Sequence, residues 1–158
     1  MKVKDNLLEN AYLKQANEIF LSEKFPWYLH GVTDEKDDNK HFFHSFYEKN
    51  NFNSGFFEII KPIVEIINPI TLHRIKLNLL TKTNEIIKHD FHKDNPSKNL
   101  TSSILYINSN NGYTEFEGGK KINSKANRLI TFKSNISHRG TTCTDEKFRM
   151  VLNLVYVK

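Results

Sequence analysis

The sequence is poor in cysteine, tryptophan, proline and arginine: its 158 residues include one Cys, one Trp, four Pro and four Arg. The single cysteine, Cys143, permits no disulfide within the chain, which is typical of proteins from a reducing cytoplasm. We therefore expect a cytoplasmic protein in which Cys143 is packed rather than reactive. Because arginine is so rare, each of the four arginines is a candidate for a specific role.

Long hydrophobic runs are also missing. No stretch approaches the roughly 18 apolar residues of a membrane span, and residues 1–6 lack the apolar segment of a signal peptide. We therefore expect no membrane span, no membrane partner and no signal peptide. Hydrophobic residues make up 38% of the chain and charged residues 26%, so the chain is not expected to be disordered. The length predicts one domain, 1–158, with a core that needs no disulfide or structural metal.

The formal net charge of +5 is modest and comes mostly from lysine, which supplies 19 of the 23 basic residues. No block of five basic residues occurs, and the 19 Asn and 15 Ile indicate that an A/T-rich genome contributes to the lysine content. Clustered arginine, a common feature of nucleic-acid surfaces, is missing. The charge therefore disfavours nucleic acid as a partner and mildly favours a neutral or acidic partner over a basic one.

Residues 1–69 combine helical patterns with aromatic runs. Apolar residues at helical spacing predict one helix over 11–23 and a second helix after Ser54, which is a candidate N-cap. The dipeptide Asn68-Pro69 is expected to end the second helix. Phe42–Tyr47 reads as an aromatic strand. This part is expected to support the remainder of the chain.

Residues 70–158 read as short strands separated by turn residues, the pattern of a β-sandwich or barrel. About eight strands are expected, the number found in a jelly roll. Their ranges are 72–80, 86–91, 102–107, 113–116, a short piece near Ile122, 128–132, 137–141 and 148–157. The fold class expected is α+β with a mainly β core.

The last expected strand, 148–157, alternates clearly. One face, which we expect to pack against the N-terminal helices, carries Phe148, Met150, Leu152, Leu154 and Tyr156. The other face points inward and carries Arg149, Val151, Asn153 and Val155. A buried arginine is expensive unless it meets an anion, so Arg149 is a candidate anion-binding residue.

His92-Lys93-Asp94 is a His-x-Asp pair. In an extended chain, residues i and i+2 point to the same side, so both side chains can reach one metal ion. The pair can equally be two solvated loop residues. His89 competes with His92 as a ligand, but its neighbour Asp90 would point to the opposite side, so we prefer His92 and Asp94.

His138 lies on a later strand of the same β region. Two His and one carboxylate occupy one face of an octahedron and leave positions for substrate and oxygen, the arrangement of non-haem Fe(II) oxygenases. An isolated His in such a stretch is more often an ordinary turn residue. Arg149 favours the metal-ligand interpretation of His138 over the turn interpretation, because an inward arginine near a metal site suits two-pronged binding of a carboxylate.

The order of these motifs resembles the Fe(II)- and 2-oxoglutarate-dependent dioxygenases, and within them the prolyl 4-hydroxylase-like branch. The resemblance covers about residues 72–157, and the N-terminal part is similar to small oxygenases of marine phages and their bacterial hosts. The segments that carry it are His92-Lys93-Asp94, Leu105-Tyr106-Ile107-Asn108, Asn111-Gly112-Tyr113-Thr114-Glu115-Phe116, Arg128-Leu129-Ile130-Thr131-Phe132, His138-Arg139-Gly140 and Phe148-Arg149-Met150-Val151-Leu152-Asn153.

The resemblance implies a double-stranded β-helix, or jelly roll, with the N-terminal helices packed on one sheet. It implies Fe(II) bound by His92, Asp94 and His138, with 2-oxoglutarate and O2 as cosubstrates and ascorbate as a possible stimulant. The far carboxylate of 2-oxoglutarate would meet Arg149 and the hydroxyl of Tyr106. Asn153 also faces inward and is a candidate for the cosubstrate end. A phage origin would place the protein in the host cytoplasm.

The resemblance implies hydroxylation of a substrate C–H bond, with a prolyl residue in a polypeptide as the favoured substrate. A free amino acid, another small molecule or a nucleobase remains open, as does a non-catalytic jelly roll that only binds a ligand. The first strand of the branch often carries a tyrosine near the pocket, and we place Leu79 at that site. Trp27, Tyr28 and Tyr113 are candidate cleft aromatics, although Trp27 and Tyr28 fit core packing better.

Four further features have two readings each or stay open. Asp34–Lys40 is either a surface loop or a lid over the substrate. Arg139 is either solvated or a substrate contact at the pocket rim. His41 and His44 are three residues apart, so on a strand they face opposite sides and do not form a joint metal site. The oligomeric state does not follow from the sequence.

Overall fold

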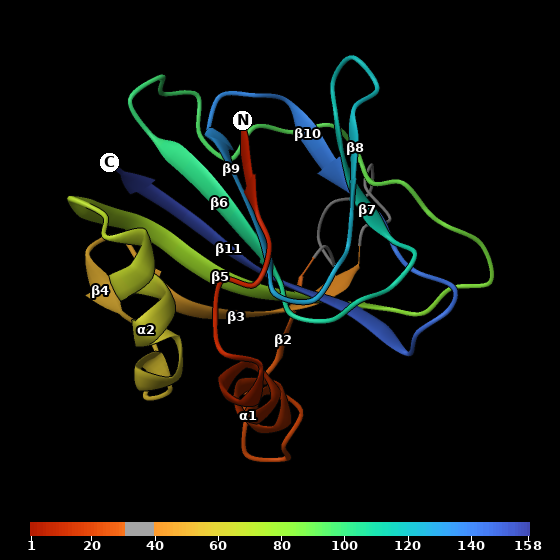
Figure 1. Ribbon diagram of the computed structural model, residues 1–158, viewed down its shortest axis with the longest axis horizontal. Coiled ribbons are helices and arrows are strands. Elements are labelled where there is room, and N and C mark those ends of the chain that lie inside the picture. The colour runs from red at the N-terminus through yellow and green to blue at the C-terminus, as the bar shows by residue number, and fades with distance from the viewer. Residues whose placement is uncertain (31–39) are drawn as a thin grey trace.

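The protein, described here from a computed structural model that places residues 1–30 and 40–158, is built from two β-sheets and two helices (Figure 1). The elements are β1 (Lys2–Lys4), α1 (Asn10–Phe20), β2 (Tyr28–His30), β3 (His41–Glu48), β4 (Asn51–Phe52), α2 (Phe57–Ile67), β5 (Thr71–Thr81), β6 (Thr101–Tyr106), β7 (Tyr113–Phe116), β8 (Lys121–Asn123), β9 (Arg128–Lys133), β10 (His138–Gly140) and β11 (Phe148–Val157). No helix in these described ranges is long and apolar enough to cross a membrane.

The large sheet has the strand order β1-β9-β6-β11-β5-β3-β2, with β4 paired to β3, and the small sheet has the order β10-β7-β8. All pairings are antiparallel. Strand β11 lies between β5 and β6 and pairs with both. The segment 86–92 runs beside β10 at the edge of the small sheet. Strands β9, β6, β11 and β5 of the large sheet therefore face the three strands of the small sheet and the segment 86–92. This arrangement is the predicted double-stranded β-helix.

The expected strand 86–91 does not form in the structure. This segment makes isolated bridges, Lys88 with Thr141 and His92 with His138, and no continuous ladder. The reason is local: the backbone N–H of Ile87 donates to the side-chain hydroxyl of Thr142 at 2.9 Å, so a side chain takes the place of a strand carbonyl. The other expected strands of this region are present, with ends that differ by at most two residues.

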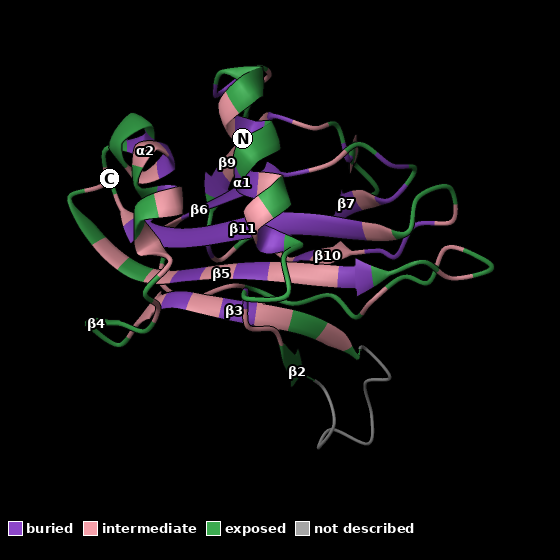
Figure 2. Cartoon of the chain, turned by 90° about the horizontal axis from the view of Figure 1, so that it is seen from below, coloured by how far each residue is buried: buried purple, intermediate pink, exposed green. Residues whose placement is uncertain are grey.

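Both helices pack on the outer face of the large sheet, away from the small sheet (Figures 1 and 2). Phe20 of α1 and Ile60 of α2 are fully buried there against outward residues of β5 and β11 such as Leu77 and Leu152. A smaller core lies between the sheets and contains Ile104, Tyr106, Phe116, Ile130, Phe132 and Val151. The predicted alternation along β11 is thus confirmed, with one face toward the helices and the other toward the space between the sheets.

The end of α2 follows from two residues: Asn68 adopts a left-handed conformation with φ 49°, and Pro69 follows it. The start of α2 differs from the prediction, because Phe56 and not Ser54 occupies the N-cap position. The Ser54 hydroxyl instead accepts a hydrogen bond from the Phe56 N–H at 3.0 Å and contacts His44 Nε2 at 2.7 Å. Ser54 therefore links the helix start to β3.

Candidate active site

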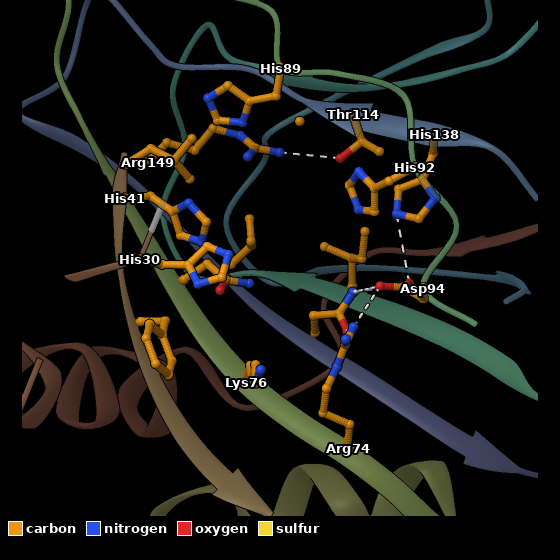
Figure 3. Close-up of a pocket in the computed structure, with 17 residues that line it drawn as sticks. His30, His41, Arg74, Lys76, His89, His92, Asp94, Thr114, His138 and Arg149 are labelled. Atoms are coloured by element: carbon orange, nitrogen blue, oxygen red, sulfur yellow. Dashed lines mark hydrogen bonds and ion pairs between the residues drawn. The ribbon is translucent and has the colours of Figure 1, made fainter. Parts of the chain in front are cut away.

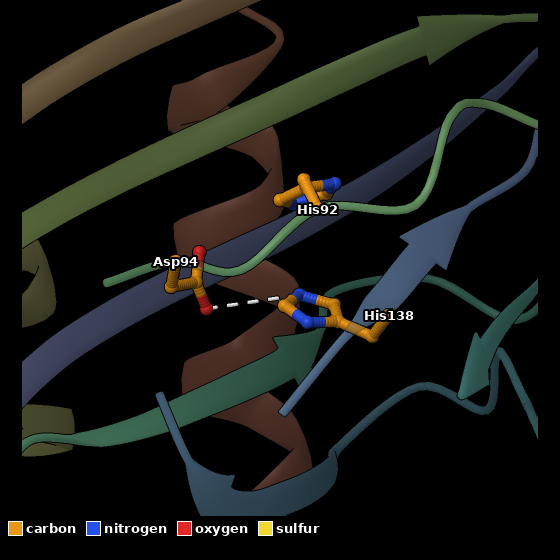
Figure 4. A group of neighbouring side chains, drawn as sticks. All are labelled: His92, Asp94 and His138. Carbon is orange, nitrogen blue, oxygen red and sulfur yellow. Dashed lines mark ion pairs between the residues drawn. The ribbon is translucent and has the colours of Figure 1, made fainter. Parts of the chain in front are cut away.

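His138 and the His92-Lys93-Asp94 pair, 44 residues apart in the sequence, meet between the sheets. One ligand atom from each of His92, Asp94 and His138 lies within 4.8 Å of the other two (Figure 4). A closed pair of backbone hydrogen bonds positions the histidines, because each of His92 and His138 donates its N–H to the other's carbonyl at 2.9 Å. The two imidazole rings then stand side by side, with centroids 4.6 Å apart.

The backbone also selects the tautomer of both imidazoles. His138 Nδ1 lies 3.0 Å from the carbonyl of Ile136, and His92 Nδ1 lies 3.3 Å from the carbonyl of Asp90. A carbonyl only accepts, so each Nδ1 carries a proton, which leaves Nε2 as the atom of each ring that can bind a metal. Burial lowers the pKa of His138 in spite of the neighbouring Asp94, which favours the neutral, metal-binding imidazole.

Asp94 is held by contacts from two strands of the large sheet. Its side chain is only 2% exposed, and Arg74 Nη2 of β5 donates to it at 2.7 Å. The amide of Asn153 on β11 donates to both carboxylate oxygens at 3.2 Å. Burial acts to raise the pKa of Asp94, but His138, Arg74 and the hydrogen bonds outweigh it and hold the pKa below its ordinary value. The carboxylate is therefore ionised and fixed in orientation.

These three side chains form one wall of a cavity of about 270 Å³ between the sheets (Figure 3). This volume is near the lower end of the range of roughly 300–1,000 Å³ for small-molecule sites. The lining residues come from both sheets and from the segment 86–94: His30, His41, Phe43, Arg74, Lys76, Asn78, Leu80, His89, His92, Asp94, Ile104, Thr114, His138, Gly140, Arg149, Val151 and Asn153.

Arg149 lies at the other end of the cavity and is 2% exposed. Its Nε donates to Ser124 Oγ at 2.8 Å and its Nη2 to Thr114 Oγ1 at 3.2 Å. No carboxylate of the described residues forms an ion pair with it, and burial lowers its pKa from the ordinary arginine value. A guanidinium remains charged in a protein, so this one is a buried cation that lacks an anion.

Tyr106 lies behind Arg149 and does not line the cavity. Its ring is 5.6 Å from the guanidinium, and its hydroxyl donates to Thr114 Oγ1 at 2.8 Å. Thr114, which lines the cavity, thus contacts both Arg149 and Tyr106, and the Tyr106 hydroxyl also lies 3.3 Å from the carbonyl of Ile122. The sequence motif contains Thr114 but does not by itself predict this contact.

Asn153 faces inward as the alternation predicts, but its amide contacts Asp94, so it lies beside the candidate ligands and not beside Arg149. Arg74 was missed altogether. A signal was present in the sequence, since polar residues recur at Arg74, Lys76 and Asn78 between apolar Ile75 and Leu77. Such an alternation marks a strand with one polar, cavity-facing side.

The assignment of Leu79 to the pocket was wrong. Asn78 and Leu80 line the cavity, whereas Leu79 does not. Successive side chains on a strand point to opposite faces, so an error of one position in the register reverses the face.

The expected cleft aromatics also lie elsewhere. Trp27 packs with the helix-side core and donates its indole N–H to the carbonyl of Phe20 at 3.0 Å. Tyr28 and Tyr113 are not among the lining residues, and the cavity aromatic is Phe43.

The two sides of β3 separate His41 from His44. His41 lines the cavity, whereas His44 is buried on the helix side, where it contacts the carbonyl of Pro26 at 2.7 Å. His89 lines the cavity but is outside the group of three candidate ligands. Burial, together with the nearby His41 and Arg149, lowers the pKa of His89 to about 4, so it is neutral near pH 7.

The structure places Arg139 and Cys143, whereas most of the suggested lid lies outside the described residues. Arg139 forms an ion pair with Glu115 at 2.7 Å and lies 4.2 Å from the ring centroid of Phe91. Cys143 is fully buried, with its sulfur 3.5 Å from the carbonyl of Glu146. Of the suggested lid Asp34–Lys40, only Lys40 lies within the described residues.

The ion pair between Arg74 and Asp94 leads to a prediction about metal binding. Arg74→Met should weaken metal binding about 10- to 100-fold, the usual cost of losing a partner that orients a ligand. Arg74→Lys, which keeps the charge, should recover part of the loss. The measurement is anaerobic titration with Co(II) followed by its visible absorption. Lys133→Met, at an exposed lysine of β9, is the control, and an affinity of Arg74→Met equal to that of this control would contradict the role.

Comparisons with known proteins agree with this architecture. No family model matches the chain, and no curated protein matches it in sequence. A prolyl hydroxylase from Trichoplax adhaerens, in complex with a peptide from the oxygen degradation domain of hypoxia inducible factor, superposes with a TM-score of 0.71 at 13% identity, over 99% of this chain and 82% of that one. A Pseudomonas putida prolyl-4-hydroxylase gives 0.59 at 11%, over 99% and 92%.

A third similar structure is the epimerase SnoN from nogalamycin biosynthesis, in complex with Fe3+, alpha ketoglutarate and nogalamycin RO. It superposes with a TM-score of 0.66 at 10% identity, over 99% of this chain and 78% of that one. All three superpose on nearly the whole of this chain. The chain therefore has the fold of the iron- and 2-oxoglutarate-dependent oxygenases.

Proposed function

We propose that this protein is an Fe(II)- and 2-oxoglutarate-dependent dioxygenase that hydroxylates a C–H bond of its substrate. One observation carries the proposal: the cavity that holds two imidazoles and an ionised carboxylate at one end holds, at the other, a buried guanidinium with no carboxylate partner among the described residues. The first set suits a divalent metal, and the second suits a carboxylate. A dicarboxylate that also chelates a metal satisfies both ends at once.

The residues fit the cofactor. Two Nε2 atoms and one carboxylate oxygen are the donors of a non-haem Fe(II) site, and they leave coordination positions open for other ligands. Fe(II), when bound by His92, Asp94 and His138, would supply the activation of O2, for which the decarboxylation of 2-oxoglutarate to succinate provides electrons. The protein's own contribution is to bind, orient and exclude water.

Particular residues of the chain would perform the binding and the orienting. Ile136 and Asp90 hold the imidazoles through their carbonyls, while Arg74 and Asn153 hold Asp94. Arg149 and the Thr114 hydroxyl would bind the distal carboxylate of 2-oxoglutarate. Tyr106 would act through Thr114, to which its hydroxyl donates.

Apolar side chains on the cavity wall support the chemistry by excluding water. Ile104 and Val151 line the cavity and are 5% and 7% exposed. A dry cavity strengthens the electrostatic contacts inside it and protects reactive species from solvent.

For the substrate we propose a prolyl residue in a polypeptide. Two of the similar folds are prolyl hydroxylases, one of them in complex with a peptide. Phe43 is the aromatic side chain that lines the cavity and can pack against a pyrrolidine ring. The small cavity and the likeness to SnoN, whose structure contains nogalamycin RO, favour a small-molecule substrate as the second candidate.

The first test of this function is turnover. Protein loaded with Fe(II) should convert 2-oxoglutarate to succinate, faster when a substrate peptide is present, and the peptide should gain one oxygen atom by mass spectrometry. His92→Ala, Asp94→Ala and His138→Ala should each abolish succinate formation while the circular dichroism spectrum stays unchanged. Turnover that persists in all three variants would rule out this metal site.

The second test concerns Arg149. Arg149→Ala should raise the half-saturating 2-oxoglutarate concentration at least about a hundredfold, because breaking a buried ion pair costs roughly 3–5 kcal/mol. Arg149→Lys should recover part of the affinity, since it restores the charge without the planar fork. Calorimetric titration of the metal-loaded protein with 2-oxoglutarate measures this directly. An unchanged affinity would show that the cosubstrate is anchored elsewhere.

The third test concerns Gly112, beside Arg149. A Cβ at this position would lie 2.7 Å from Arg149 Cδ and 2.7 Å from the backbone carbonyl of Thr142, too close for either to remain in place. Gly112→Ala should therefore weaken 2-oxoglutarate binding at least about tenfold through displacement of the guanidinium, and overpacking should destabilise the fold by about 1–3 kcal/mol. Gly55→Ala is the matched control, because nothing lies within 4 Å of its added Cβ.

A further inference from the structure

The inner face of β5 forms a polar wall of the cavity. Arg74, Lys76 and Asn78 alternate with apolar residues along the strand and all line the cavity. β3 and β2 extend the large sheet beyond β5 and add Phe43, His41 and His30. Figure 3 shows His30, His41 and Lys76 on the far side of the cavity from His138. The proposed metal and cosubstrate use His92, Asp94, His138 and Arg149, so this wall is left for the primary substrate.

The charges of the described residues in and beside the cavity do not balance when metal and cosubstrate are bound. Arg74, Lys76 and Arg149 are the cationic lining residues, and Asp94 is the carboxylate among the described ones. Fe(II) and the 2-oxoglutarate dianion carry equal and opposite charges and cancel. Outside the lining, Glu48 Oε1 lies 3.4 Å from Lys76 Nζ. Among the described residues, three cations therefore face two carboxylates even when Glu48 is counted, which leaves one positive charge in excess.

Lys76 is the cation best able to meet a substrate. Arg74 is occupied by Asp94 and Arg149 would be occupied by the cosubstrate, whereas the Lys76–Glu48 pair is partly exposed, at 25% and 35%. A partly exposed ion pair is weak, so a carboxylate arriving within the cavity competes with Glu48 for the ammonium group. Lys76 Nζ also lies 5.4 Å from the ring centroid of Phe43, which places a cation and an apolar surface side by side.

We infer that the substrate is an acidic polypeptide segment, with an Asp or Glu close to the hydroxylated residue and its carboxylate bound by Lys76. The inference rests on the proposed function, because it assigns the wall across the cavity from the candidate metal ligands to the substrate. The net charge of +5 acts in the same direction, since it attracts an acidic partner over a longer range.

Binding without turnover tests the inference first. The protein is loaded with Fe(II) and 2-oxoglutarate in the absence of oxygen and titrated with proline-centred peptides whose flanking residues are Asp and Glu, Asn and Gln, or Lys. The acidic peptide should bind at least about tenfold more tightly than its amide counterpart, and added salt should reduce the difference. Equal or tighter binding of the amide peptide, or no binding of any peptide, would overturn the inference. Free aspartate and glutamate, compared with asparagine and glutamine, form a parallel series, and a carboxylate preference confined to that series would replace the polypeptide by a small acid.

A charge-altering variant then locates the contact. Lys76→Gln should bring the ratio of acid to amide affinity close to one, and Lys76→Glu should shift the preference to the lysine peptide. Lys133→Gln should keep the wild-type ratio. Because the readout is a ratio within each variant, a general loss of affinity does not affect it, and circular dichroism establishes that each variant is folded. An unchanged ratio in Lys76→Gln would remove Lys76 from the substrate site.

The outcomes separate this inference from the proposed function. Conversion of 2-oxoglutarate without any peptide, a slow side reaction that needs only the metal and cosubstrate sites, reports on the oxygenase alone. If that conversion occurs and the acid preference does not, the oxygenase assignment stands and the acidic substrate falls. If 2-oxoglutarate is neither bound nor converted, the proposed function falls first.

Discussion

A buried positive charge, Arg149, with no carboxylate partner in the part of the chain that the structure describes, is the constraint around which the interior is arranged. Arg149 is nearly inaccessible, and its described hydrogen-bond partners are hydroxyls and not carboxylates. Leaving a guanidinium so placed is expensive unless an anion completes it. The packing around Arg149 is also restrictive. Gly112 leaves room for its side chain, and any larger residue there would collide with it. Such an arrangement makes physical sense as a site for an anionic ligand.

The large sheet performs two tasks with the same strands. The outer faces of β5 and β11 bury Ile75, Leu77 and Leu152 against the helices. Their inner faces present Arg74 and Asn153 to Asp94. Because the outer faces are packed in the main core, the inner polar groups stand on a rigid support, which suits the small tolerances of a metal site.

Asp94 shows why that support matters. It belongs to a segment that makes isolated bridges and no full ladder, so its own backbone restrains it less than a strand would. The side chains from β5 and β11 supply the missing restraint and keep the carboxylate ionised. The histidines need no such help, because backbone hydrogen bonds join their segments to each other directly.

Local patterns were sufficient for much of the fold. The two-residue alternation of Phe148–Val157 identified the strand, its two faces and the inward direction of Arg149, because a strand's side-chain period is a property of its own backbone. The spacing of His92 and Asp94 likewise placed both on one side before any partner was known. The helix over 57–67 ended where Asn68-Pro69 predicted, since a left-handed residue and a proline act within their own turn.

Contacts between distant segments were decided by the tertiary structure alone. Arg74 meets Asp94 and Asn153 only because the sheet brings β5 and β11 beside the segment 86–94, and no spacing in the sequence encodes that pairing. The error at Leu79 has the same origin, because register depends on how a strand pairs with its neighbours. The sequence by itself determined most strands of residues 70–158, the two helices and the shared side of His92 and Asp94, all of which rest on short-range geometry. The polar cavity wall of Arg74, Lys76 and Asn78, with Phe43 and His41 of β3 beside it, came from pairing between strands that are not adjacent in the chain order.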